Sequence, residues 1–263
     1  MLAEDHVGFR QRDGHIVVLY GDDDGLLTRK AVQYFVEGIA RGDSLFVVAT
    51  PEHWRAFSAD LDESGLDSQR AVREGAIIVL DAEDVLAQIM CDGEPDAALF
   101  DAVVGAPIRA LADETHVDIR VYGEMVGILW TAGLSEAAAQ LELLWNDLRA
   151  TVQFALFCAY PVDVFGNEFQ VPAVDSILCA HSELITIDDD RRLEQGLGHG
   201  IDRVLGQGAV DVRPSIESNR RVAWARLPQA ESTILWLRDK LPVYADEIVD
   251  AAHEYFRGTS SPP

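Results

Sequence analysis

The sequence is poor in cysteine and in long hydrophobic runs, and each shortage excludes a class of protein. Its 263 residues include three cysteines, Cys91, Cys158 and Cys179, an odd number too small for a disulfide framework. No apolar run approaches the roughly 20 residues of a membrane-spanning helix. The first residues lack the basic and apolar segments of a signal peptide. We therefore expect a cytoplasmic protein with reduced thiols and no membrane partner.

Basic residues are scarce as well. The chain has 45 acidic residues against 21 basic ones, 19 of which are arginine, and its formal net charge is −24. Such a surface repels nucleic acid, and no basic patch interrupts it. The hydrophobic content of 48% is ordinary for a globular protein. We therefore expect an acidic, solvated surface around a normal core, and no nucleic-acid partner.

Buried strands alternate with amphipathic helices over the first part of the chain. Continuous apolar runs predict strands at residues 15–20, 44–49, 76–80, 119–122 and 153–159. Helical spacing predicts helices at 26–41, from Pro51, at 83–90, from Asp96 with a kink or restart at Pro107, at 125–130, and at 136–149 with Ser135 as cap. The connections are too long for hairpins. The predicted fold class is therefore α/β, with a mainly parallel sheet flanked by helices.

The pattern changes after residue 165. We expect residues 1–165 to form the α/β core and residues 166–190 to form a separate segment after it, with a helix or strand between 176 and 187. Residues 191–263 are expected to form a C-terminal helical extension, beginning with a glycine-rich loop at 195–208 and ending in a disordered tail. The last predicted helix, 242–256, has an apolar stripe. It should pack on the α/β domain or on a second copy, which would make a homodimer.

The loop after the first strand stands where nucleotide-binding proteins hold phosphate, but it carries the wrong groups. A phosphate loop has the pattern G-x-x-x-x-G-K-S/T. Here three aspartates, Asp22 to Asp24, separate Gly21 from Gly25, and two leucines replace the lysine and the hydroxyl. The carboxylates would repel a triphosphate. One or two of them are explained by capping of the following helix, and adjacent aspartates do not specify a magnesium site.

Two further positions are candidates for chemistry. Glu124 follows the predicted strand 119–122, and ligands of open α/β sheets bind beyond the carboxyl ends of strands. Its role is either ligand contact or helix capping. Cys179-Ala-His181, together with Cys158, offers metal ligands, but this spacing is not that of a zinc knuckle and no second cysteine–histidine pair exists. The sequence therefore predicts neither a metal site nor a cofactor.

Five blocks of sequence resemble one known family. They are residues 15–20, Arg120–Val126 with Leu129-Trp130, Gln140–Leu148, Phe157–Pro161 and Cys179–His181. They resemble the MEDS domain, the methanogen/methylotroph dichloromethane-regulator sensory domain, over about residues 13–185. The resemblance implies a RecA-like fold, related to KaiC-type ATPases, that has lost its phosphate loop. It also implies sensing of small molecules such as hydrocarbon derivatives, beside DNA-binding or histidine-kinase modules.

No helix-turn-helix or kinase motif is visible in this sequence, so the output of such a sensor would pass through a protein partner. We therefore predict a non-catalytic signalling protein that binds an unknown small molecule, neutral or cationic. The candidate ligand-binding residues are Tyr20, Asp22, Asp23, Tyr122, Glu124, Tyr160 and His181. Two alternatives remain: a nucleotide hydrolase or transferase that uses Glu124 and an unconventional loop, and a ligand-free adaptor that binds a signalling protein.

Overall fold

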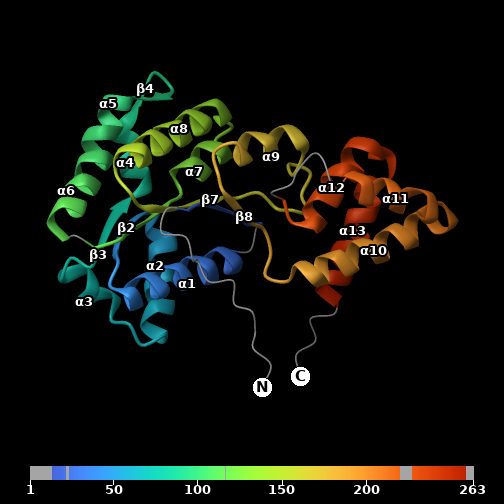
Figure 1. Ribbon diagram of the computed structural model, residues 1–263, viewed down its shortest axis with the longest axis horizontal. Coiled ribbons are helices and arrows are strands. Elements are labelled where there is room, and N and C mark those ends of the chain that lie inside the picture. The colour runs from blue at the N-terminus through green and yellow to red at the C-terminus, as the bar shows by residue number, and fades with distance from the viewer. Residues whose placement is uncertain (1–13, 22–23, 116, 220–226, 259–263) are drawn as a thin grey trace. The chain divides into compact units, whose positions relative to one another are not determined.

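The computed structural model describes residues 14–21, 24–115, 117–219 and 227–258, and its centre is a six-stranded, all-parallel sheet (Figure 1). The strand order is β3-β2-β6-β7-β1-β8. The strands are β1 (His15–Leu19), β2 (Ser44–Ala49), β3 (Ile77–Asp81), β6 (Ile119–Gly123), β7 (Ala155–Tyr160) and β8 (Glu183–Ile185). In register, Val47 of β2 lies opposite Val79 of β3 and Tyr122 of β6. The predicted α/β class is confirmed.

Helices cover both faces of this sheet, which is why its inner strands are apolar along their whole length. Helices α1 (Gly25–Arg41) and α2 (Pro51–Glu63) cover one face, where Phe35 and Phe57 pack edge-on against Tyr122 with ring centroids 5.7 and 5.2 Å away. Helices α5 (Ala97–Phe100) and α8 (Ser135–Thr151) cover the other face, where Phe100 packs on Trp145 at 5.1 Å. Strands β1, β2, β6 and β7 are buried throughout.

Most helix starts follow from local sequence. Thr50 caps α2 by accepting a hydrogen bond from the His53 amide, Pro51 takes the first helical position, and Asp96 caps α5. Ser135 was expected to cap α8, but it is the first helical residue and Leu134 occupies the cap position without a side-chain bond. The remaining elements here are α3 (Ser68–Arg73), α4 (Ala82–Ile89), the hairpin β4 (Met90–Cys91) and β5 (Glu94–Pro95), α6 (Ala106–Thr115) and α7 (Met125–Thr131).

Pro107 does not break its helix. A π-helical turn, Asp101–Gly105, connects α5 to α6, and the proline is the second residue of α6. A wider turn accommodates a residue that cannot donate the usual backbone hydrogen bond. At the position where the sequence predicted a kink or a restarted helix, the chain changes from a π-helical turn to an α-helix without a break.

The chain divides into two compact units. The first contains most of the sheet and its covering helices up to Pro161, together with residues 180–183. The second contains residues 19–22, 162–179 and the chain from Leu184 onward. Its helices are α9 (Val171–Leu178), α10 (Asp190–Leu205), the 3-10 turn η2 (Gly206–Gly208), α11 (Ala209–Asn219), α12 (Gln229–Lys240) and α13 (Pro242–Gly258). The expected disordered tail lies outside the described residues apart from Gly258.

The expected glycine-rich loop at 195–208 is wrong, because most of this segment belongs to α10. A side chain at Gly200 would place its Cβ 2.4 Å from the backbone oxygen of Ile248, and one at Gly196 would come within 2.8 Å of the Ala252 oxygen. Both oxygens belong to α13. The glycines therefore permit two helices to approach closely, and they do not mark an irregular segment.

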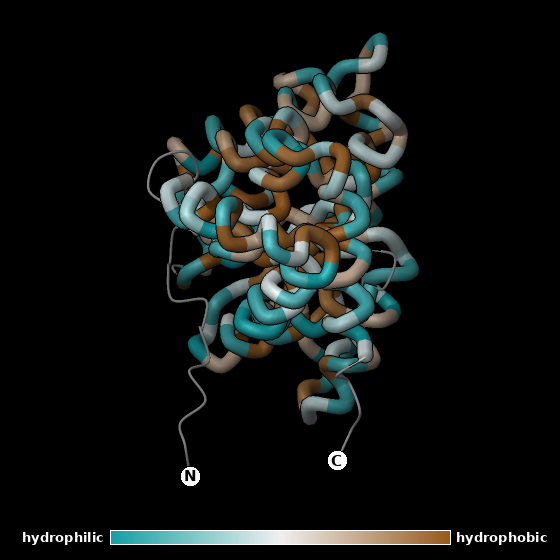
Figure 2. The backbone as a smooth tube through the Cα atoms, turned by 90° about the vertical axis from the view of Figure 1, so that its right-hand side faces the viewer, coloured by the Kyte–Doolittle hydropathy of each residue, from teal (hydrophilic) through white to brown (hydrophobic). Residues whose placement is uncertain are grey.

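Helix α13 buries an apolar face, as its sequence predicts. The buried residues are Ala245, Ile248, Val249, Ala251 and Ala252. Within the second unit this face packs on α10 and α12. These helices belong to the extension itself and not to the α/β domain, so the expected partner is wrong, and packing on a second copy stays a prediction. In Figure 2 the backbone of the helices alternates between hydrophobic and hydrophilic colours, as one-sided burial requires. In the described part of the chain no helix combines the length and hydrophobicity needed to span a bilayer.

Candidate functional site

The carboxyl ends of β2 and β6 form a topological switch point in the sheet. These two strands are parallel neighbours. After β2 the chain continues to β3 on one side, and after β6 it continues to β7 on the other. The connections leave in opposite directions, and this is where open α/β sheets form ligand crevices. Thr50 and Glu124, the first residues after β2 and β6, lie at this position.

Glu124 is 2% exposed and links the two strands through three hydrogen bonds. Its carboxylate accepts from the Tyr122 hydroxyl at 2.7 Å, from His53 Nδ1 at 2.5 Å and from the Thr50 amide. It stands at the cap position of α7 but makes no side-chain bond to that helix. The helix-capping interpretation is therefore wrong, because the carboxylate connects β6 to the start of α2.

His53 lies between two carboxylates. Its Nδ1 faces Glu124, its Nε2 lies 3.5 Å from Asp24 Oδ2, and its ring stacks on Phe57. Burial, the largest influence, lowers the pKa of His53, but the hydrogen bonds and charges of Glu124 and Asp24 outweigh it, so the net pKa is raised. The Asp24 side chain is 52% exposed, so it lies between the His53 ring and solvent. Asp24, Thr50, His53, Tyr122 and Glu124 are called the His53 cluster below.

A second polar cluster is fully buried between the sheet and α8. His15 begins β1, Cys158 and Tyr160 lie on the same face of β7, Glu142 comes from α8, and His181 precedes β8. These five residues are called the Glu142 cluster. Glu142 Oε2 lies 3.3 Å from His15 Nε2 and 3.7 Å from Cys158 Sγ. Its Oε1 lies 3.3 Å from His181 Nε2 and accepts a hydrogen bond of 2.9 Å from Tyr160.

The electrostatics of the Glu142 cluster favour an ionised carboxylate beside a protonated thiol and a protonated phenol. Burial raises the pKa of Glu142, but the charges and hydrogen bonds of His181 and His15 outweigh it and hold the pKa well below its usual range. Burial lowers the pKa of His15. Burial and the Glu142 charge raise the pKa values of the Cys158 thiol and the Tyr160 hydroxyl. Glu142 is therefore ionised at neutral pH, whereas the thiol and the phenol keep their protons.

Asn146 fixes the orientation of His15. Its Oδ1 lies 3.1 Å from His15 Nδ1, and its Nδ2 donates to the Ala180 carbonyl at 3.4 Å. That carbonyl belongs to the Cys179-Ala-His181 segment. Only His181 of this segment enters the cluster, because Cys179 is exposed.

The candidate residues from the sequence separate into these clusters. Tyr122 and Glu124 belong to the His53 cluster, and Tyr160 and His181 belong to the Glu142 cluster. Tyr20 is buried at the end of β1 and falls in the second unit. Asp22 and Asp23 lie outside the described residues. The order β6-β7-β1 confirms that the strands ending at Tyr122, Tyr160 and Tyr20 are neighbours or one apart. A pocket shared by these side chains stays a prediction.

Sequence reasoning missed His53, His15 and Glu142. The signal for the last two was present, since each is a polar residue within an apolar pattern: His15 opens the run HIVVL, and Glu142 adjoins the stripe of Leu141 and Trp145. Burying such groups is costly unless they are paired. For His53 the signal was weaker, because it is one of several polar residues in the first turn of α2.

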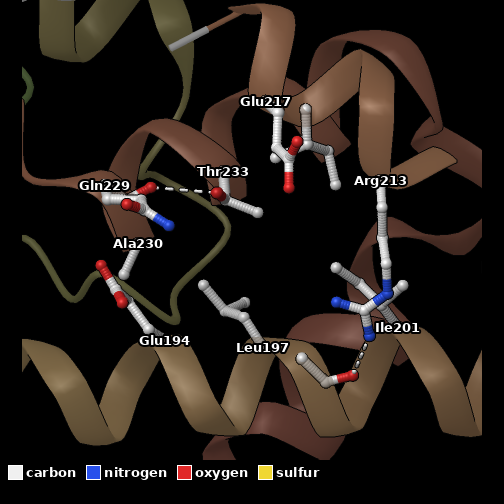
Figure 3. A pocket seen from close by; sticks show the side chains of 10 residues that line it. Glu194, Leu197, Ile201, Arg213, Glu217, Gln229, Ala230 and Thr233 are labelled. Atoms are coloured by element: carbon white, nitrogen blue, oxygen red, sulfur yellow. Dashed lines mark hydrogen bonds between the residues drawn. The ribbon is translucent and has the colours of Figure 1, made fainter.

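The helical extension contains a hollow of its own (Figure 3). Helix α10 contributes Leu197, Gly198 and Ile201, while α11 and α12 contribute Ile216 and Ala230. Polar side chains also line it: Glu194, Arg213, Glu217, Gln229 and Thr233. The Arg213 guanidinium is engaged with Asp202 Oδ1 at 2.7 Å and the Gly198 carbonyl at 3.3 Å. The hollow therefore has an apolar lining from three helices. Its one arginine, Arg213, is already bound to Asp202 and to the Gly198 carbonyl.

The fold and the two clusters define a class: a three-layer parallel α/β domain whose first loop lacks the residues of a phosphate site. Within that class the chain belongs to the MEDS family, the MEthanogen/methylotroph, DcmR Sensory domain, whose family model matches residues 14–182. This range contains every member of both clusters, and the helical hollow lies outside it. Membership gives the chain a sensory or signalling role. A search among curated proteins finds no match.

Proposed function

We propose that this protein is a non-catalytic, cytoplasmic sensor that binds a small neutral or cationic molecule at the His53 cluster and relays the signal to a protein partner. The observation that carries the proposal is the position of the cluster. It occupies the switch point between β2 and β6, and it combines a buried carboxylate, an imidazole and a half-exposed carboxylate. Membership in a sensory family supports it.

Charge selects the class of ligand. An anion approaching His53 would meet the carboxylates of Asp24 and Glu124, and each close like-charge contact costs about 1 kcal/mol or more. A cation or a hydrogen-bond donor would instead pair with the half-exposed Asp24 carboxylate. The completely buried Phe57 ring stacks on His53 with the ring centroids 5.8 Å apart and so supports the imidazole from the core side. A small organic cation, or a neutral molecule with one donor group, fits these surroundings best.

The neighbouring loop argues against the nucleotide hydrolase alternative. Leu27, one of the two leucines that replace the lysine and hydroxyl of a phosphate loop, is completely buried and faces the core. Glu124, the only base that the sequence suggested for such an enzyme, already accepts three hydrogen bonds. A general base needs a lone pair directed at its substrate. These contacts instead suit a rigid recognition element.

The test is a calorimetric titration of the whole chain with methylammonium, methanol, formate and phosphate. We expect saturable binding of methylammonium or methanol and none of the two anions. His53→Ala should weaken binding at least tenfold, because it removes the centre of the cluster. Glu124→Gln should weaken methylammonium more than methanol, because it removes charge but keeps the shape.

A matched control separates the His53 cluster from the helical hollow. Gly198 lines the hollow, and a Cβ placed there meets no atom within 4 Å, so Gly198→Leu starts a bulky side chain in open space at the hollow. Binding that survives this substitution and is lost in His53→Ala supports the proposal. The reverse result would move the ligand to the hollow in Figure 3. Absence of saturable binding by all four probes would favour the adaptor alternative.

A further inference from the structure

The Glu142 cluster has no part in the sensing site proposed above, and its chemistry is that of a metal centre. We propose that His15, Glu142, Cys158 and His181 bind one divalent transition-metal ion, with Zn²⁺ as the best match. The four residues come from four separate parts of the chain and converge on one buried point. The inference stands independently of small-molecule sensing.

Geometry is the first support. Each residue offers one ligand atom, and all four atoms lie within 4.8 Å of one another. His15 Nε2 lies 3.3 Å from both Cys158 Sγ and Glu142 Oε2, and His181 Nε2 lies 3.3 Å from Glu142 Oε1. In a tetrahedral zinc site with bonds of about 2.0–2.3 Å, ligand atoms are about 3.3–3.8 Å apart. Small side-chain rotations therefore suffice to surround an ion.

Charge balance is the second support. Two neutral imidazoles, one carboxylate and one thiolate carry two negative charges, which a divalent ion cancels. Each of the four residues is at most 3% exposed, and an uncompensated charge in such a place is expensive. Binding forms the metal–sulfur bond and releases the thiol proton of Cys158 to solvent. The mixture of nitrogen, oxygen and sulfur donors suits zinc and disfavours magnesium or calcium.

Orientation of the imidazole is the third support. Because Asn146 Nδ2 is directed at the Ala180 carbonyl, its Oδ1 faces His15 and accepts a hydrogen bond from Nδ1–H. In the neutral ring, Nε2 then presents a lone pair toward Glu142 and Cys158. Without a metal, a proton on Nε2 makes the 3.3 Å contact with Glu142 Oε2 a hydrogen bond, and a bound ion would take the place of that proton. Histidine ligands of metals are commonly held in this way by an outer amide or carbonyl.

The surrounding side chains complete the arrangement. The Tyr160 hydroxyl donates to Glu142 Oε1 and so orients the carboxylate. Cys179, two residues before His181, is exposed and contributes nothing to the group of four ligands. It therefore provides a control thiol in the same segment of chain.

The experiment uses the full chain, stripped of metal by a chelator and titrated with Co²⁺ as a spectroscopic probe and with Zn²⁺ by calorimetry. We expect one Co²⁺ per chain, a thiolate-to-cobalt charge-transfer band, the intense visible bands of tetrahedral Co²⁺, and displacement by Zn²⁺. Cys158→Ser should abolish the charge-transfer band, whereas Cys179→Ser should leave it unchanged. Asn146→Ala should weaken Zn²⁺ binding about 10- to 100-fold, as loss of an outer partner does.

Two results would overturn the inference. The first is absence of the charge-transfer band in the wild-type chain, which would leave the cluster as a hydrogen-bonded core network. The second is a band that survives in Cys158→Ser, which would place the metal elsewhere. If Cys158→Ser does not fold, as judged by circular dichroism, the charge-transfer band of Cys91→Ser and Cys179→Ser replaces it: a band kept in both variants assigns the sulfur to Cys158, and a band lost in either overturns the inference. Titration of methylammonium in the metal-free chain keeps this outcome separate from the proposed sensing function.

Discussion

Buried charged side chains differ in how completely their neighbours compensate them. Arg120 is well served, since its guanidinium pairs with Asp43 at 2.8 Å, donates to the Tyr34 carbonyl and lies over the Tyr34 ring. Glu231 of α12 is not. Its Oε1 accepts from Thr186, but Oε2 has no hydrogen-bond partner among the described residues. Because burial of the Glu231 carboxylate is only partly compensated, its ionisation makes the stability of the fold depend on pH.

Glu231 should make the chain less stable at pH 8 than at pH 5. Burial, aided by the charges of Asp190 and Glu194, raises the pKa of Glu231 from 4.5 to about 7, against the opposing hydrogen bond from Thr186. The folded state therefore holds this proton more tightly than the unfolded state, and the associated stability is lost as the pH rises through 7. The loss is at most about 3 kcal/mol.

Urea denaturation of the wild-type chain and of Glu231→Gln at pH 5 and pH 8 measures this effect. The variant should show a flatter pH dependence and be the more stable of the two at pH 8. The comparison removes the general repulsion of an acidic chain, because both proteins share it. Parallel pH profiles would show that Glu231 is hydrated or paired in solution.

At the scale of elements, the sequence predicted the strands, because an apolar run is a local signal, but it did not predict features that depend on distant contacts. The five strands of the α/β region follow from continuous apolar runs, and their boundaries are correct to within about two residues. Helix α10 was misjudged because isolated glycines destabilise a helix by about 1 kcal/mol each. Its glycines are tolerated because α13 fills the space, and a contact between distant segments leaves no local signal.

The same reasoning explains why only part of each cluster could be predicted. Glu124 was a candidate because the end of a strand has a known significance, yet its partner His53 lies 71 residues earlier. His15 and Cys158 are 143 residues apart, and neither suggests the other. Burial of a polar residue predicts that a partner exists. Identifying that partner requires the strand order, which periodicity does not provide.

Gly200 and Gly198 of α10 form a matched pair for the close approach of α10 and α13. Gly200→Ala should destabilise the chain by roughly 1–3 kcal/mol, because its Cβ would meet the Ile248 oxygen at 2.4 Å. Gly198→Ala meets nothing within 4 Å and should stabilise by up to about 1 kcal/mol through helix propensity. Denaturant unfolding of both variants gives the comparison. Equal effects would mean that the two helices are not in tight contact in solution.

At the scale of the whole molecule, an α/β sensory region is followed by a helical extension that the family match does not include. The architecture places a loop at the phosphate position, but its groups are unsuited to nucleotides. Fold alone therefore says little about ATP, because function depends on the groups a site presents. The distinction between sensor and enzyme is open to a direct measurement.

The chain should not bind ATP–magnesium at useful affinity. Neither the lysine nor the hydroxyl of a phosphate loop is present, and Leu27 is buried where that hydroxyl would stand. Calorimetry with ATP and magnesium at near-physiological salt should show no saturable heat. Micromolar binding, equivalent to roughly 8 kcal/mol, would restore the hydrolase alternative.

The place of β1 in the sheet has a consequence for synthesis on the ribosome. This first strand lies between β7 and β8, and the His15 amide bonds to Ser182, 167 residues later. At 5–20 residues per second, roughly 10 to 30 s separate the emergence of these two segments. For most of that interval, until β7 (Ala155–Tyr160) is made, this apolar strand has neither of its sheet neighbours to pair with. The nascent chain therefore needs protection from aggregation until its last strand is made.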